Sequence, residues 1–72
     1  MKVIVKHQSR GRIRVQIAQP RMSLEQADLL ECYLRELPQI TRACVHERTR
    51  CAIVEYQGSR TDNLHALSRF SY

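Results

Sequence analysis

Polar and apolar residues alternate strictly along residues 12–17, which read RIRVQI. A period of two is typical of a strand with one buried face, because successive side chains point to opposite sides of a sheet. The three aliphatic residues of this segment are therefore expected to face a core. Arg12, Arg14 and Gln16 are expected to face the other way.

A helical period replaces this alternation after residue 22. Ala27, Leu30, Leu34 and Leu37 recur at spacings of three and four residues, which makes one apolar stripe on a helix, and Leu24 is expected to extend the stripe by one turn. The same pattern predicts that Cys32, beside the stripe, is a small buried or half-buried residue.

Both ends of this helix carry local signals. Ser23 followed by Gln26 is a capping-box pattern, in which the hydroxyl and the side-chain amide each satisfy a free backbone N–H. Pro38 cannot continue the hydrogen-bond ladder. The helix is therefore predicted over residues 23–37.

A hairpin is predicted before the helix. Residues 2–7 are rich in β-branched side chains, and residues 8–11 read as a turn in which Gly11 can take a positive φ. These features predict a strand over 2–7 paired antiparallel with a strand over 12–18. One long bent strand is the less favoured alternative because of the glycine.

A second hairpin and a second helix are predicted after Pro38. Residues 40–46 and 51–56 are strand-like and flank a polar loop at 47–50. Gly58 breaks the pattern, and Ser59 then provides a helix N-cap. The predicted fold is α+β in the order β-β-α-β-β-α, a mostly antiparallel two-layer sandwich with both helices on one face of the sheet.

Two helices leave the other face of this sheet uncovered. If His46 lies opposite Cys51 across the loop, strand parity decides which side chains line that open face, and a slip of one residue would reverse the assignment. The predicted open face consists of Arg12, Arg14, Gln16, Arg42, Cys44, His46, Cys51, Ile53 and Glu55.

Composition narrows the class of protein. Seventy-two residues favour a single domain over 1–72, and the formal net charge of +5 favours an acidic partner or a simple solubility role. No run of eighteen apolar residues occurs, and three cysteines without paired spacing favour a reducing, cytoplasmic location. Neither a nucleophile with an adjacent base nor a glycine-rich phosphate loop is found, so no enzyme activity and no cofactor are expected.

The junction between the second predicted strand and the helix resembles that of the heavy-metal-associated domain. This ferredoxin-like module occurs in copper chaperones and at the cytoplasmic N-termini of heavy-metal-transporting P-type ATPases, with the signature Gly-Met-Thr-Cys-x-x-Cys. Here the segment reads RMSLEQA, so Met22 matches the family's methionine and Ser23 its threonine, while Leu24 and Ala27 replace both metal-binding cysteines.

Further segments extend the resemblance over most of the chain. Residues 37–40 resemble the family's Leu-Pro-Gly-Val, and residues 70–72 resemble the Gly-Tyr that closes its second helix. Residues 7–14 most resemble a divergent bacterial subgroup that lacks the cysteine pair. The family's last strand is absent, and we predict that the strand over 2–7 takes its edge position.

The resemblance implies a degenerate domain of a P-type ATPase that acts in regulation or docking within metal transport and metal ion homeostasis. Its expected partners are other domains of the transporter, or an acidic protein or membrane surface. The expected docking surface contains Arg12, Arg14 and Arg42. A free sheet edge would also allow a homodimer.

Two alternatives of other classes remain open. Cys44, His46 and Cys51 provide an S₂N ligand set that suits Cu(I) or Zn(II), which would make the chain a metal-binding or metallochaperone-like domain. The basic composition would also suit a small nucleic-acid-binding module. Nucleic acid is unlikely on the pattern, because the aromatic residues are predicted on helices or facing the core, where they cannot stack with bases.

Overall fold

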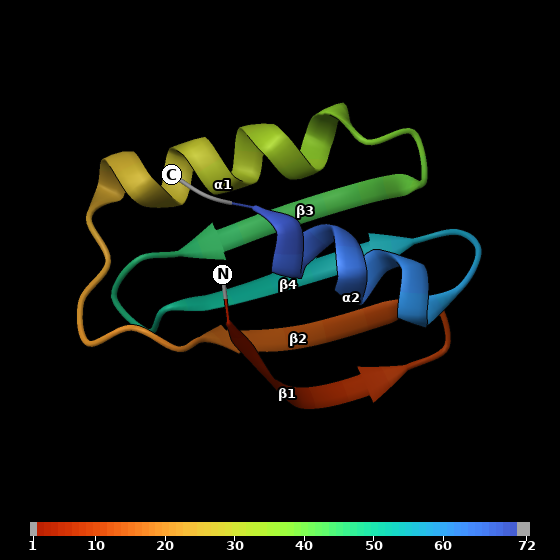
Figure 1. Cartoon of the computed structure of the whole chain (residues 1–72), viewed down its shortest axis with the longest axis horizontal. Helices are drawn as coiled ribbons and strands as arrows, with labels where there is room; N and C mark the ends of the chain where they lie inside the picture. Colours follow the sequence, from red (N-terminus) through yellow and green to blue (C-terminus); the bar gives the residue numbers. More distant parts are fainter. Residues whose placement is uncertain (1, 71–72) are drawn as a thin grey trace.

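The computed structural model describes residues 2–70, which form four strands and two helices (Figure 1). In chain order the elements are β1 (Val3–Ser9), β2 (Arg12–Ile17), α1 (Leu24–Glu36), β3 (Ile40–His46), β4 (Cys51–Tyr56) and α2 (Arg60–Arg69). Neither helix of the described chain is long and apolar enough to cross a membrane.

The strands form one antiparallel sheet in the order β1-β2-β4-β3, so β1 and β3 are its edges. Both helices lie on the same side of this sheet in Figure 1. The fold is therefore α+β, with a four-stranded antiparallel sheet and two helices, and is compatible with a small two-layer sandwich.

The first hairpin confirms the predicted pairing and corrects its boundaries. β1 runs to Ser9 and pairs with Arg12, so the turn consists of only two residues, the second being Gly11 with a φ of 76°. A bulge between Val5 and His7 shifts the register of β1. The alternative of one long bent strand is wrong.

The second hairpin has the predicted register, with His46 opposite Cys51. An irregularity between Ile40 and Arg42 was not predicted. Simple alternation would place Ile40 on the open face with Arg42, but the extra residue returns Ile40 to the covered face, where it packs against the core.

Both helix starts are as predicted. The Ser23 Oγ accepts a hydrogen bond from the Gln26 backbone N–H at 3.1 Å, and the Gln26 Oε1 accepts one from the Ser23 backbone N–H at 3.1 Å. The second helix has a simpler cap, in which the Ser59 Oγ accepts from the Asp62 backbone N–H at 3.4 Å. A complete capping box therefore sets where α1 begins.

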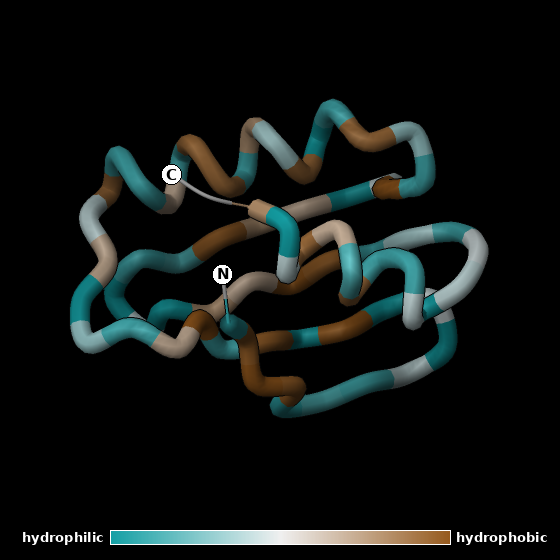
Figure 2. The backbone as a smooth tube through the Cα atoms, viewed as in Figure 1, coloured by the Kyte–Doolittle hydropathy of each residue, from teal (hydrophilic) through white to brown (hydrophobic). Residues whose placement is uncertain are grey.

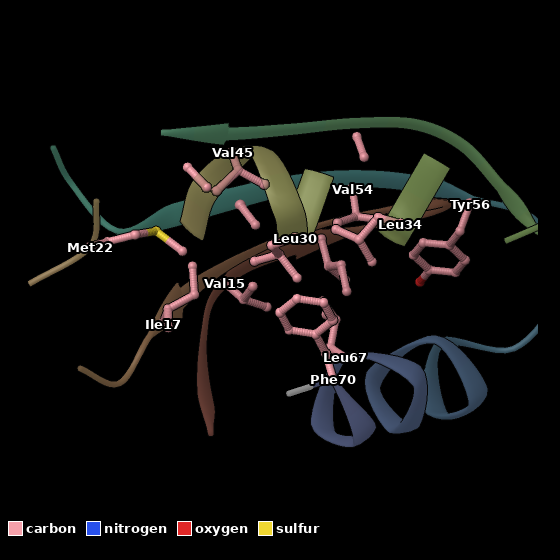
Figure 3. Packing of buried hydrophobic residues seen from close by; sticks show 14 residues of the cluster. Val15, Ile17, Met22, Leu30, Leu34, Val45, Val54, Tyr56, Leu67 and Phe70 are labelled. Atoms are coloured by element: carbon pink, nitrogen blue, oxygen red, sulfur yellow. The ribbon is translucent and has the colours of Figure 1, made fainter. Parts of the chain in front are cut away.

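The core lies between the sheet and the helices, and hydrophobic segments gather there in Figure 2. Figure 3 shows Leu67 of α2, and Phe70 directly after this helix, pointing toward the same cluster as Leu30 and Leu34 of α1. The Tyr33 hydroxyl also joins the two helices, because it donates to the Ala66 carbonyl at 2.9 Å. The buried apolar residues are Ile13, Val15, Ile17, Met22, Ala27, Leu30, Leu34, Ala43, Val45, Ala52, Val54, Tyr56, Leu67 and Phe70.

Two predictions for α1 are wrong. Leu24 is 62% exposed, and Cys32 is also exposed. A helix turns by about 100° per residue, so Leu24 lies about 80° from Leu34, at the flank of the stripe, and Cys32 lies on nearly the opposite side from the core. The buried Met22, just before the helix, covers this end of the core instead.

Candidate functional site

The uncovered face of the sheet is the candidate functional site. The two central pairings place Arg14 opposite Ile53 and Arg12 opposite Glu55, and Arg42 faces Glu55 from the other side. All nine residues predicted for the open face therefore belong to it. The alternate positions of β2 and β4 are buried, which confirms the predicted parity.

Positive charge dominates this face. It carries Arg12, Arg14 and Arg42 against one carboxylate, Glu55. The Arg42 Nε lies 3.9 Å from a Glu55 carboxylate oxygen, and both side chains are well exposed to solvent, at 78% and 41%. An exposed ion pair of this length is weak, and three guanidinium groups against one carboxylate leave this face with a net positive charge.

The edge strand β1 adds two polar side chains that the sequence pattern did not assign to this face. His7 pairs with Arg14 and Ser9 pairs with Arg12 in the strand register. With Ile53, these four residues line a hollow of about 280 Å³. The extension of β1 to Ser9 and the two-residue turn place them there, and the alternation of residue types gives no signal for this extension.

The two guanidinium groups in this hollow are free of protein partners. Within residues 2–70, the side chains of Arg12 and Arg14 make no hydrogen bond and no ion pair. A second hollow of about 220 Å³ adjoins the first, since both are lined by Arg12 and Ile53, and it includes Arg42, Cys44 and Glu55. The open face therefore has one hollow lined only by cationic, neutral polar and apolar side chains, and another that contains an acid.

The three residues of the alternative metal site lie on one face but do not converge. The Cys44 Sγ is 3.5 Å from the His46 Nε2, whereas the Cys51 Sγ contacts the Thr49 carbonyl at 3.5 Å. In the described part of the chain, no group of three or more His, Cys, Asp or Glu side chains is arranged to hold a metal ion. Cys44 and His46 alone form a close pair.

Leu24 and Ala27, which the sequence resemblance aligns with metal-binding cysteines, lie at the start of α1 in different environments. Leu24 is exposed at the first helical position, and Ala27 is buried one turn later. Neither side chain has an atom that can donate to a metal. Met22, just before the helix, is buried at this end of the core.

Other basic residues of the chain serve the fold. The Arg50 guanidinium donates to the Gln19 carbonyl at 2.6 Å, and the Arg50 carbonyl accepts from the Ile17 N–H at 2.7 Å, so this residue connects the β3–β4 loop to the end of β2. Arg60 at the start of α2 donates to the Gln8 side chain of β1. Some of the chain's basic residues therefore stabilise the fold and do not add positive charge to the open face.

Aromatic side chains are absent from the open face as far as residues 2–70 show. Tyr56 is buried, and Tyr33 and Phe70 pack against each other with ring centroids 4.9 Å apart. Tyr72, which belongs to the predicted closing motif, lies outside the described residues. The described face therefore has no platform on which nucleic-acid bases could stack.

Comparison with known proteins identifies no relative: no family model, no curated protein and no solved structure matches this chain.

Proposed function

We propose that this chain is a docking domain whose open sheet face binds an acidic surface. The observation that carries the proposal is the pair of guanidinium groups of Arg12 and Arg14, which lie on the same face of a central strand and have no partner within residues 2–70. Exposed arginines that the fold does not use are available for carboxylates or other oxyanions. Arg42 extends the same positive surface toward the other edge.

The partner of this surface is, in our proposal, another domain of the same protein, a heavy-metal-transporting P-type ATPase with this domain at its cytoplasmic N-terminus. The resemblance of residues 21–27 and 37–40 to the heavy-metal-associated family supports this assignment. The position of β1 supports a ferredoxin-like arrangement as well, because β1 pairs with β2 at the sheet edge where the family has its last strand.

The replacement of the metal loop supports docking over metal transfer. Leu24 and Ala27 provide no ligand atom, so the residues at the family's metal position cannot hold Cu(I). In this proposal the domain keeps the shape of the metal-binding module and acts through charge complementarity, which determines orientation and association rate more than affinity.

A titration of the reduced protein with Cu(I) and Zn(II), followed by NMR, tests the loss of metal binding. We expect no stoichiometric uptake and no shift changes at residues 24–27. Uptake of one equivalent with shifts at Cys44, His46 and Cys51, abolished by Cys44→Ser with Cys51→Ser, would instead establish the metal-binding alternative, which the 3.5 Å contact between Cys44 and His46 favours.

The family assignment has its own test in the variant Leu24→Cys with Ala27→Cys. If residues 21–27 correspond to the family's loop, the two new thiolates should bind one equivalent of Cu(I) that the unmodified chain does not bind. A matched control moves the pair one residue along, with Glu25→Cys and Asp28→Cys. Equal Cu(I) uptake by both variants would contradict the assignment.

A carboxylate-rich probe tests docking directly. Binding of a polyglutamate peptide should weaken strongly in Arg14→Glu and Arg42→Glu and should fall with rising salt. Arg69→Glu, an exposed position on α2 on the other side of the sheet, makes the same charge change and should have a smaller effect. Equal losses in all three variants would mean that net charge alone drives binding, and the docking face would be wrong.

A further inference from the structure

We infer that the hollow between β1 and β2 on the open face is a binding site for a phosphomonoester group. Its donors are the side chains of His7, Ser9, Arg12 and Arg14. The inference rests on the proposed function, because it identifies the chemistry recognised at one end of the same docking face.

The strand pairing brings these four donors together. Ser9 lies opposite Arg12 and His7 lies opposite Arg14, so each strand contributes two side chains, at alternate positions on the same face. Directly opposed residues of an antiparallel pair have Cβ atoms about 5 Å apart, and alternate residues along a strand are about 7 Å apart. Long arginine side chains can therefore converge on one anion with the shorter histidine and serine beside them.

The surroundings of the hollow favour an anion. It is lined by two arginines, a histidine, a serine and Ile53, without a carboxylate. The nearest acid of the sheet, Glu55, is directed to the neighbouring hollow, where its carboxylate approaches Arg42. Ile53 is the one apolar residue that lines the hollow beside these polar groups.

The number and charge of the donors match a phosphomonoester better than a carboxylate. A phosphomonoester has three terminal oxygens and a charge between about −1.5 and −2 at pH 7, which two guanidinium groups neutralise. A guanidinium group can donate to two phosphate oxygens at once in a planar fork, and a hydroxyl or imidazole N–H can donate a hydrogen bond to the third oxygen. A single carboxylate would occupy only one of the two arginines.

Two sources of this group are distinguishable: a free or small-molecule phosphate, and the headgroup of phosphatidic acid. We would titrate the protein with inorganic phosphate, following amide shifts by NMR and using acetate as the control anion. In parallel we would measure binding to phosphatidylcholine vesicles with and without phosphatidic acid, using phosphatidylserine as the control lipid. Saturable shifts at residues 7–14 with phosphate, or vesicle binding that requires phosphatidic acid, are the expected results.

Arg14→Gln provides the decisive variant. It should weaken phosphate binding about tenfold or more, because a charge-assisted pair of hydrogen bonds is lost. The matched control is Arg42→Gln, which removes the same charge from the neighbouring hollow and should lower phosphate affinity much less than Arg14→Gln does. Both positions are exposed, so both variants should keep the melting temperature of the unmodified protein.

Three results would overturn the inference: no response to phosphate or to phosphatidic acid, equal responses to acetate and phosphatidylserine, or equal losses in the two arginine variants. If polyglutamate binding through the open face persists in any of these cases, the proposed docking function stands and only the phosphate site is wrong. If phosphate binds but polyglutamate does not, the phosphate site stands and docking to a carboxylate-rich surface is wrong.

Discussion

The two faces of the sheet are built from the same strands but obey different constraints. On the covered face, Ile13, Val15 and Ile17 of β2 are at most 1% exposed and belong to the same buried cluster as apolar residues of both helices. On the open face, the intervening Arg12 and Arg14 have no partner in the described fold. Adjacent residues of one strand therefore differ completely in what the fold requires of them.

This difference separates stability from recognition. Burial of apolar surface on the covered face stabilises the domain, at about 25 cal/mol per Å² of apolar surface removed from water. The open face contributes one weak, exposed ion pair and otherwise leaves its charged groups unused. Substitutions on the covered face should therefore strongly change the free energy of unfolding, and substitutions of charged residues on the open face should mainly change binding.

Placing a carboxylate on the covered face should have the largest effect. Val15 is fully buried at the centre of β2, and Val15→Asp would bury a charge or a protonated acid without a partner, at a cost of more than about 4 kcal/mol. A domain of 72 residues has only about 4–11 kcal/mol in total. We expect circular dichroism to show a largely unfolded or severely destabilised chain. Gln16→Asp, the next residue and on the open face, should remain folded, and equal loss of structure in both variants would contradict the assignment of the faces.

The parts of the fold that local sequence patterns predict correctly are those with short-range signals. Alternation along β2, the capping box at Ser23 and the glycine at position 11 are all short-range signals, and the structure confirms each of them. The register of the second hairpin follows from the same parity, because a one-residue slip would expose every buried side chain of β4.

Bulges and helix phase limited the prediction of the site. The bulge between Val5 and His7 depends on how β1 fits the twisted edge of β2, which alternation of residue types does not encode. The turn predicted over residues 8–11 also ends the strand too early, so the hollow that His7 and Ser9 form with the arginines is missed. The prediction for Leu24 is wrong because Leu24 precedes Ala27 by three residues, a spacing that rotates it about 60° around the helix axis from Ala27. This rotation carries Leu24 out of the buried stripe.

A second comparison uses the same substitution on both faces of the central strands. Ile13→Ala removes a fully buried side chain of β2 and should lower the free energy of unfolding by about 2–5 kcal/mol. Ile53→Ala removes a half-buried side chain from the open face of β4 and should cost about 1 kcal/mol. Urea unfolding with a common slope for both variants measures the difference. Equal costs would show that Ile53 is as important for packing as Ile13.

Asn63 is the one buried polar side chain of the covered layer among the described residues, and its Oδ1 has no hydrogen-bond partner. Its Nδ2 donates to the Ser59 carbonyl at 2.8 Å, but that carbonyl also accepts the Asn63 backbone N–H at 3.2 Å. Asn63→Leu should therefore raise the free energy of unfolding by about 1 kcal/mol, since an unsatisfied buried acceptor is removed.

Asn63→Asp provides the opposite change at the same position, because it adds a buried charge in place of the amide and should lower the melting temperature. Thermal unfolding of the two variants measures both effects. A lower melting temperature in Asn63→Leu as well would mean that the side-chain bond to Ser59 stabilises the start of α2 by more than the unpaired oxygen costs.

The smallest effect on stability is expected at Glu55, the only acid of the open face among residues 2–70. Its ion pair with Arg42 spans 3.9 Å between exposed groups, so Glu55→Gln should change the free energy of unfolding by less than about 0.5 kcal/mol. The same change leaves the face entirely cationic and should strengthen binding of polyglutamate and of phosphate at low salt, with a smaller gain at high salt. Glu36→Gln, at the exposed end of α1, alters net charge equally and should leave both affinities nearly unchanged. If the two variants bind equally well, the local charge of the open face does not determine recognition. The two faces would then differ only in how tightly their side chains are packed.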